Sequence, residues 1–324
     1  MNVEKLLKDL VNIPSPSGEE KKIGEFLVGL LSKNFKIEKQ KLGNRFNILA
    51  YVGKPDVILS SHLDTVPKQL EIKEDEKFVY GRGSCDAKAS IASMICASEN
   101  LINRGYTNFG LLFDVSEETN FDGIKMAVNL VKPKVVIIGE PTNLKPAVGQ
   151  KGLLGIEIKC YGKSAPGSTP KKGISAILRL IKVLTKISKI KQRKNIVLGS
   201  SSINIGKILG GGSANVVPDY AEAIIEFRTV NKNSEIIKKL KRLNVNFKVL
   251  YNFNPVLTNE CLKKGIVVSF FTEAFFWRKS RFLILGPGEY KFAHSNNERI
   301  RKNDLQKAVK VYESLVIKFL NELE

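Results

Sequence analysis

Histidine and cysteine, the side chains most often used as metal ligands or nucleophiles, are scarce in this chain of 324 residues, which has two histidines and four cysteines. No two cysteines have the C-x-x-C spacing of a zinc ribbon, and their wide separation does not suggest a disulfide framework. We therefore expect free thiols in a reducing compartment. The four cysteines are Cys85, Cys96, Cys160 and Cys261.

Long apolar runs and targeting signals are also missing. No run of about eighteen apolar residues is present, so no membrane-spanning helix is expected. The segment MNVEKLLKDLVNIPSPSGEE (1–20) is charged and amphipathic, without the apolar core of a secretory signal. A hydrophobic fraction of 43% and a charged fraction of 26% are typical of globular proteins. These features together predict a cytoplasmic protein with no membrane partner.

Acidic residues are too few to balance the basic ones: 32 Asp and Glu against 52 Lys and Arg give a formal net charge of +20. Such a charge favours an acidic partner, which can be nucleic acid, an anionic membrane surface or an acidic protein. Much of the excess lies in residues 171–194 and 238–242. An ordinary solvated helix face also explains such lysines, but it does not explain why so few acids accompany them. A helical projection places three lysines opposite three apolar residues: Lys182, Lys186 and Lys189 against Leu178, Ile181 and Leu184.

The chain divides into three segments by pattern. In residues 1–150, helical segments alternate with short apolar runs such as residues 57–59, which predicts an α/β domain with a mixed, mostly parallel sheet flanked by helices. Residues 151–254 alternate polar and apolar positions in β-α-β-β order, which predicts an inserted α+β domain. Residues 255–324 return to helix and strand, and we expect them to complete the first domain.

One of the two histidines follows a predicted buried strand directly, in SSHLDTVP (60–67). Side chains alternate along a strand, so His62 and Asp64 point the same way. A carboxylate so placed can hold one ring nitrogen of a histidine whose other nitrogen binds a metal. A surface histidine hydrogen-bonded to a loop acid is the simpler alternative, and these eight residues alone do not decide between the two.

Further carboxylates lie at the carboxyl ends of other predicted strands or in an adjoining loop. Asp86 lies in GRGSCDAK ahead of a helix, Glu117 and Glu118 end LLFDVSEE, and Glu140 ends VVIIGE. In open α/β sheets, ligands bind outside this edge. One histidine and one carboxylate for each ion, with an aspartate shared between them, would build a two-metal site that includes His294. Each acid alone is explained as a solvated loop acid, but their joint placement favours the metal site.

Five segments taken in order resemble the di-zinc amidohydrolase family that includes acetylornithine deacetylase, succinyl-diaminopimelate desuccinylase, aminoacylase and carboxypeptidase. The resemblance covers nearly the whole chain and includes an inserted lid domain, which implies a zinc-peptidase-like catalytic domain. Serine or cysteine nucleophiles fit less well, because no GxSxG elbow is present and both histidines are assigned to metals. The matching segments are SSHLDTVP, GRGSCDAKAS, SEETNFDG, GEPT and AHSNNE.

The resemblance implies a role for nine residues and two divalent metal ions, zinc first and cobalt second. At the end of a lid strand, an arginine could hold a substrate carboxylate through two parallel hydrogen bonds, or it could pair with a neighbouring acid. The implied roles are His62 and Glu140 on one ion, Glu118 and His294 on the other, Asp86 bridging both, Asp64 orienting His62, Glu117 as general base, and Asn215 and Arg228 on the substrate.

The lid motif departs from the family at one position. Many members carry a lid histidine, which a partner subunit supplies to stabilise the oxyanion. The corresponding segment here is YGKSAPGSTP, with Pro166 in that place. Proline has no donor, so the role is lost or passes to another residue. The residues considered for it are Ser164, Ser168, Thr169 and Asn215.

Within the family, the short chain and compact lid resemble enzymes that release lysine or ornithine from an acidic amino-group carrier protein, the last step of lysine or arginine biosynthesis. The excess of basic residues would steer such a substrate. Acetylornithine deacetylase and succinyl-diaminopimelate desuccinylase are the nearest alternatives. A homodimer through the lid is also expected. A nucleic-acid-binding protein on an inactive hydrolase scaffold is the alternative from another class, but no nucleic-acid-reading motif is present.

Overall fold

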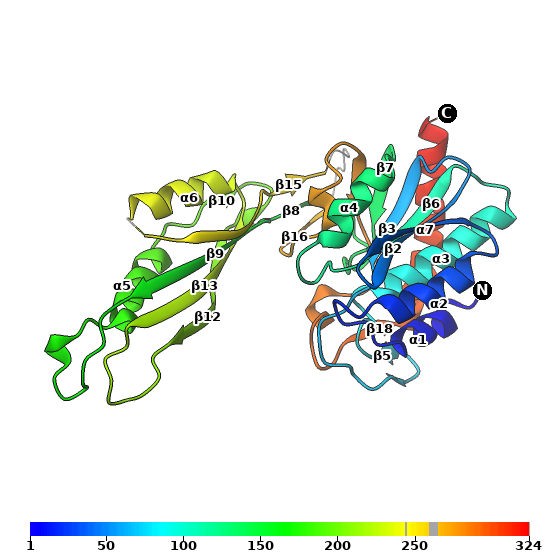
Figure 1. Cartoon of the computed structure of the whole chain (residues 1–324). Helices are drawn as coiled ribbons and strands as arrows, with labels where there is room; N and C mark the ends of the chain where they lie inside the picture. Colours follow the sequence, from blue (N-terminus) through cyan, green and yellow to red (C-terminus); the bar gives the residue numbers. More distant parts are fainter. Residues whose placement is uncertain (244, 259–264, 324) are drawn as a thin grey trace. The chain divides into compact units, whose positions relative to one another are not determined.

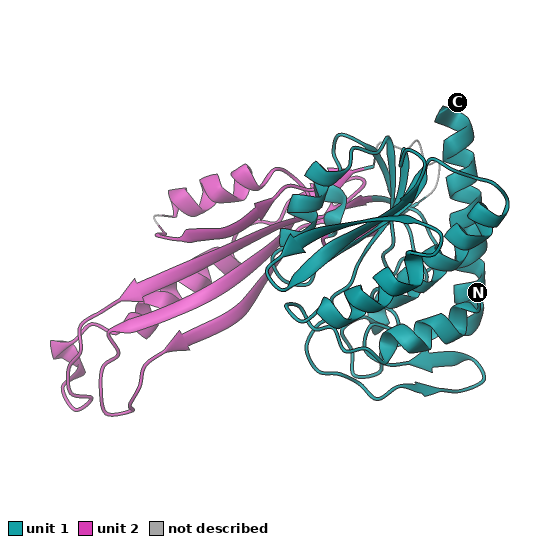
Figure 2. Cartoon of the chain, turned by 45° about the vertical axis from the view of Figure 1, so that its right-hand side comes forward, with its two compact units in different colours: residues 1–148, 258–266, 272–324 teal, residues 149–257, 267–271 magenta. Residues whose placement is uncertain are grey.

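A computed structural model describes residues 1–243, 245–258 and 265–323. The chain forms two compact units (Figure 2), one of residues 1–148, 258–266 and 272–324 and the other of residues 149–257 and 267–271. We call them the first and the second unit. The segment expected to be inserted, residues 151–254, lies inside the second unit. Cys261 lies outside the described residues, and the other three cysteines are free.

A mixed sheet runs in the order β1-β2-β6-β3-β7-β17-β8-β15 with β16 paired to β8 (Figure 1). Its strands β1, β2, β6, β3, β7 and β17 lie in the first unit, whereas β15 lies in the second. The four strands β6, β3, β7 and β17 are parallel, and the strands on either side pair antiparallel. The predicted mixed α/β sheet is therefore confirmed, with its parallel part limited to these four central strands. The strands are β1 (Lys36–Leu42), β2 (Arg45–Val52), β3 (Val57–His62), β6 (Phe109–Asp114), β7 (Val135–Ile138), β8 (Ala147–Gln150), β15 (Val256–Leu257), β16 (Ile266–Val268) and β17 (Arg281–Ile284).

Helices cover both faces of this sheet. The side chains of α1, α2, α3 and α7 share one apolar core with alternate residues of the central strands. Asn47, which alternates with the core residue Ile48, donates from its side chain to the Gly123 carbonyl of α4, so α4 covers the opposite face. The helices are α1 (Val3–Val11), α2 (Lys21–Leu31), α3 (Lys88–Asn103), α4 (Asp122–Leu130) and α7 (Lys302–Leu323). No described helix is long and apolar enough to cross a membrane.

A small three-stranded sheet, in the order β18-β5-β4, was not expected from the sequence. Its strands are only two or three residues long, too short to show a period-two pattern. The sheet lies in the first unit, and its strand β18 follows the segment that carries His294 and directly precedes α7 in the chain. The strands of this sheet are β4 (Lys73–Glu74), β5 (Phe78–Tyr80) and β18 (Arg299–Arg301). The first unit also contains two 3-10 turns, η2 (Glu273–Phe275) and η3 (Tyr290–Phe292).

The second unit is an antiparallel sheet in the order β12-β13-β9-β14, with α5 and α6 packed on one face. Leu180 and Leu184 of α5 are buried in this core. Leu178 and Ile181, predicted to lie on its buried side, are instead 60% and 51% exposed. That prediction was wrong because the buried face of the helix was inferred only as the side opposite the lysines. The elements are β9 (Gly152–Tyr161), η1 (Pro170–Lys172), α5 (Ala176–Ser188), β10 (Lys194–Asn195), β11 (Gly199–Ser200), β12 (Ser202–Gly210), β13 (Tyr220–Thr229), α6 (Asn233–Arg242) and β14 (Lys248–Phe253).

Candidate metal centre

The carboxyl ends of β3, β6 and β7 meet at one edge of the first unit's sheet, because the three strands are parallel neighbours. His62 is the last residue of β3, Glu117 and Glu118 follow β6, and Glu140 follows β7. Asp86 lies in the loop that leads into α3. The run of β-branched and other apolar residues that buries each strand therefore also sets where these polar side chains emerge.

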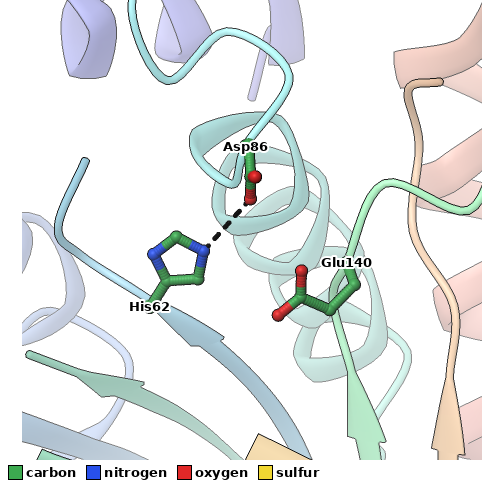
Figure 3. A group of neighbouring side chains, drawn as sticks. All are labelled: His62, Asp86 and Glu140. Carbon is green, nitrogen blue, oxygen red and sulfur yellow. Dashed lines mark hydrogen bonds and ion pairs between the residues drawn. The ribbon is translucent and has the colours of Figure 1, made fainter. Parts of the chain in front are cut away.

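One group of ligand atoms comes from His62, Asp86 and Glu140, all buried, within 4.8 Å of one another (Figure 3). His62 Nε2 lies 3.2 Å from Asp86 Oδ1. The three side chains come from a strand end, a loop and a second strand end, and Figure 3 shows them turned toward a common point. Imidazole nitrogen and carboxylate oxygen at this separation are a donor set that suits zinc and neighbouring transition metals.

A second group comprises Asp86, Glu118 and His294, again within 4.8 Å of one another. His294 Nε2 lies 2.8 Å from Glu118 Oε1 and 3.4 Å from Asp86 Oδ2. Asp86 thus belongs to both groups, with Oδ1 toward His62 and Oδ2 toward His294. A shared carboxylate presenting one oxygen to each group is the arrangement that a pair of neighbouring ions requires.

Asp64, predicted to orient His62, contacts the ring through both its side chain and its backbone. The carboxylate lies 3.6 Å from His62 Nδ1, within the range of an ion pair, and the Asp64 backbone carbonyl lies 2.9 Å from the same nitrogen. A proton on Nδ1 donated to that carbonyl leaves Nε2 free as a ligand. The carboxylate also accepts from the backbone N–H groups of Glu117 and Glu118, both at 3.0 Å, and from the Ser17 hydroxyl at 2.6 Å. It therefore fixes the turn that presents both glutamates.

A buried ion pair that the sequence did not reveal supports Asp86. Glu298 Oε1 accepts from the backbone N–H groups of Cys85 and Asp86, at 3.0 and 3.1 Å. Its other oxygen, Oε2, accepts from Arg82 Nη1 at 2.6 Å. Both residues stand in segments that matched the family, GRGSCDAK and AHSNNE, so the signal was present although neither residue was singled out.

Glu117 is buried beside both groups but belongs to neither. Burial raises the pKa of its carboxyl well above the ordinary value; Glu140 and Glu118 raise it further, whereas His62 lowers it. Burial likewise raises the pKa of Glu140, and Asp86 adds to this effect. Several desolvated carboxyl groups crowd one small volume, and positive ions would relieve their mutual repulsion. The residues therefore fit a pair of divalent cations.

Both histidines hold protons strongly in the ion-free chain. Hydrogen bonds to Asp86 and then Glu118 raise the pKa of His294 to about 10, against a smaller opposing effect of burial. For His62, burial acts to lower the pKa, but Asp64 and Asp86 outweigh it and the net shift is upward. A metal ion must displace these protons before it binds the imidazoles.

Asn215 and Arg228, predicted to contact substrate, lie in the second unit and in neither ligand group. The Asn215 carbonyl accepts from the Gly167 N–H at 2.6 Å, which joins the Gly-rich loop to the segment that carries Pro166. Arg228 Nη2 lies 2.9 Å from Glu226 Oε1, on its own strand β13. The guanidinium is thus paired with an acid, which was the alternative to substrate binding, although the acid is on the same strand.

Two further buried acids, Asp114 and Glu273, were not predicted as part of the site. Burial raises the pKa of Asp114 well above its ordinary value and that of Glu273 to about 7. Asp114 ends β6 beside His62 in register, and Glu273 begins η2. The sequence gives little warning, because Glu273 stands in the apolar run FFTEAFFW (270–277).

An α/β sheet with histidine and carboxylate ligands at its carboxyl edge defines a class of metallohydrolases. Residues 58–318 match the model of peptidase family M20/M25/M40, and the chain belongs to this family. A protein of Aspergillus flavus named probable carboxypeptidase is 34% identical to it, over 95% of this chain and 88% of that protein. The chain is accordingly a metal-binding hydrolase.

Solved structures with the same fold include two from other organisms. The M20 family metallo-carboxypeptidase Sso-CP2 from Sulfolobus solfataricus has a TM-score of 0.81 at 18% identity, over 97% of this chain and 98% of that chain. The Bacillus subtilis YXEP protein, described as a dinuclear metal binding peptidase, has a TM-score of 0.71 at 16% identity, over 98% of each chain. At these identities the likeness concerns the fold.

Proposed function

We propose that this protein is a di-metal amide hydrolase that releases lysine or ornithine from the terminal glutamate of an acidic amino-group carrier protein. The observation that supports the hydrolytic centre is the pair of ligand groups that share Asp86, with the buried Glu117 carboxyl beside them. His62, Asp86 and Glu140 would hold one ion, and Glu118 and His294 would hold the other together with Asp86. Zinc is the proposed metal, and cobalt is the second choice.

The residues of the chain divide the work of hydrolysis among them. Bound divalent ions supply Lewis acidity, which polarises a carbonyl oxygen and makes water more acidic. Glu117 would accept a proton from the attacking water and pass it to the leaving amine. Asp64 keeps Glu117 and Glu118 in position through their backbone N–H groups, and Glu298 does the same for Asp86.

The distribution of charge supports an acidic macromolecular substrate. The 114 residues of the second unit contain 20 Lys and Arg against five Asp and Glu, a formal charge of +15. The first unit therefore carries only +5 of the chain's +20. A free acyl-amino acid needs no such surface, whereas an acidic protein would be attracted to it over about a Debye length, roughly 8 Å at physiological salt.

Other substrates remain alternatives of the same chemistry. The name of the Aspergillus flavus relative suggests a peptide with a free carboxyl terminus. Acetylornithine and succinyl-diaminopimelate would use the same centre without the basic surface. A nucleic-acid-binding protein without activity is the alternative from another class, and retention of all five ligand residues argues against it.

We also propose a cytoplasmic homodimer formed through the second unit. β12 is an edge strand of its sheet, and Ile205, Ile208 and Leu209 on it are exposed. Exposed apolar edge strands pair readily with another strand. Because Pro166 has no donor, a partner's lid would not supply an oxyanion ligand from this position.

The decisive experiment compares hydrolysis of carrier-linked lysine, free acetylornithine and a carboxyl-terminal peptide, each with and without a chelator. The proposal expects the carrier-linked substrate to have the highest kcat/KM and every activity to stop when the metal is removed. Efficiency on the carrier should fall about ten-fold or more from low to high salt, with kcat little changed, because steering acts on association. A better rate on acetylornithine or the peptide, or indifference to salt, would reject the carrier and keep the hydrolase.

A charge-reversal variant tests whether the lysines of α5 attract the acidic substrate. Changing Lys182, Lys186 and Lys189 of α5 to Glu should raise KM for the carrier-linked substrate and leave a small acyl-lysine unaffected. The matched control changes three exposed lysines of the first unit to Glu and should have a much smaller effect on KM. The control lysines are Lys22, Lys307 and Lys310.

A further inference from the structure

His294 is held less securely than the other ligand residues. Its imidazole is 44% exposed, whereas the side chains of His62, Asp86 and Glu140 are buried. Its backbone is in the left-handed region, with a φ of 59°, which a residue with a side chain adopts at a cost of about 1 kcal/mol or more. Such a conformation persists only where the surroundings fix it. Contacts to the flanking residues must therefore hold this segment in place.

One such contact is a stack of aromatic rings around Arg299. Its guanidinium carbon lies 4.1 Å from the ring centroid of Phe292, two residues before His294. The same group lies 5.1 Å from the centroid of Phe78 and 5.9 Å from that of Tyr80. Cations within about 6 Å of a ring centroid are attracted by the π-system, and partly desolvated examples are the stronger ones. Arg299 thus joins the His294 segment to β5.

The strand that receives this stack is itself well fixed. Arg299 pairs with Tyr80 in the register of β18 and β5. The Tyr80 hydroxyl donates to Asp75 at 2.8 Å, and Asp75 also accepts the backbone N–H groups of Lys77 and Phe78. Arg299 Nε is buried and has no hydrogen-bond partner among the described residues, so ring contacts dominate at this side of the guanidinium. Hydrogen bonds therefore hold the Phe78 and Tyr80 rings of β5 in place, and Arg299 connects Phe292 to these rings.

We infer that Arg299 is a positioning residue for His294: its guanidinium holds Phe292 against β5 and so keeps the His294 imidazole near Glu118 and Asp86. The inference rests on the proposed metal centre for its consequence but not for its geometry. Loss of the stack releases the segment at residues 292–294 and lets the imidazole leave its 2.8 Å contact with Glu118. His62 and Glu140 lie on other elements and keep their places.

The test uses two variants. Arg299→Met keeps a long apolar side chain without the positive charge, and Arg299→Lys keeps the positive charge without the planar guanidinium group. The matched control is Arg104→Met, which removes a similar stack, 5.2 Å from Tyr106, elsewhere in the first unit. Only two imidazoles are present, so ring resonances of the metal-free protein report on His294 with His62 as the internal reference. Arg299→Met should move and broaden the His294 resonances and leave those of His62 unchanged. Arg104→Met should change neither.

Cobalt titration of the same variants gives the second measurement. Two binding steps are expected in the unaltered protein, and Arg299→Met should weaken only the step assigned to His294, by about two- to thirty-fold, the range of a cation–π contact. In Arg299→Lys, the affinity of this binding step should lie between that of the unaltered protein and that of Arg299→Met. Combining Arg299→Met with Phe292→Leu should add little to either change alone, because both remove one contact.

Unchanged His294 resonances in both Arg299 variants would overturn the inference, as would equal displacement of His62 or equal weakening of both steps. A different failure applies to the proposed function. If cobalt does not bind the unaltered protein but Arg299→Met still moves only the His294 ring, the positioning role stands and the di-metal hydrolase does not. Unchanged His62 resonances also show that each variant is folded.

Discussion

Affinity for metal should depend steeply on pH, because ions and protons compete for the same imidazoles. Hydrogen bonds to Asp86 and Glu118 raise the pKa of His294 to about 10, so this ring is protonated throughout the neutral range in the ion-free protein. Binding must release that proton, which makes affinity rise about ten-fold for each pH unit. From pH 6 to pH 8 the gain is about a hundred-fold, or about 2.7 kcal/mol. The pKa of His62 is also raised, so the affinity for the other ion should likewise increase with pH.

Cobalt titration by calorimetry in two buffers of different ionisation enthalpy measures both the affinity and the number of protons released. At least one proton should leave with the ion held by His294 at pH 7, and His294→Asn should abolish that step. An affinity independent of pH between 6 and 8, or heats independent of the buffer, would refute the reasoning.

The same shift predicts the stability of the chelated protein. A group whose pKa is raised by folding stabilises the fold fully below its unfolded value, near 6.5 for histidine, and loses this contribution as the pH rises through the folded value, about 10 for His294. The free energy of unfolding with EDTA present should therefore fall between pH 7 and pH 10. Since the imidazole is 44% exposed, solvent screening reduces the total loss of stability, and the sign of the pH dependence is the quantity to test. Urea unfolding at several pH values, with His294→Asn as the reference, checks the sign.

Other substitutions separate the roles at the centre. Glu117→Gln should keep both ions and lower kcat by about 10²- to 10⁴-fold, since only the proton acceptor is lost; loss of metal from this variant would count against that role. Glu118→Gln should instead weaken one ion, as metal analysis would show. Glu298→Gln leaves the buried Arg82 without its anion and should reduce the free energy of unfolding by about 3–5 kcal/mol. A change below about 1 kcal/mol in urea unfolding would contradict this account of the pair.

The sequence was most informative where local pattern and topology coincide. Short apolar runs identified β3, β6 and β7, and parallel strands bring their carboxyl ends to one edge, so the amino-acid pattern predicted that His62 and Glu140 lie at the same edge of the sheet. Asp86 and His294 lie in loops, so strand topology did not place them, and their grouping was expected from the family resemblance. Ligands at strand ends are the ones that the pattern of the strands predicts.

Hydrogen-bond partners were much less predictable. That Asp64 contacts His62 through its carbonyl as well as its carboxylate depends on a turn of two residues, which period-two reasoning does not resolve. The partner of Arg228 is two residues away on its own strand, a pairing that follows from side-chain rotamers. Arg299 gave no signal, because its partners come from a sheet of very short strands. Contacts between distant short segments need the tertiary structure.

The position of β17 has a consequence for how the protein is made. This strand lies between β7 and β8 in the sheet, yet it follows the whole inserted segment in the chain. During synthesis from the amino terminus, the second unit, which has its own core, is therefore complete before the catalytic sheet can close. Until β17 emerges from the ribosome, β7 has an unpaired edge of the kind that joins to other chains. The first unit is thus the last part of the chain to lose its aggregation-prone strand edge, and His294 is synthesised only after β17.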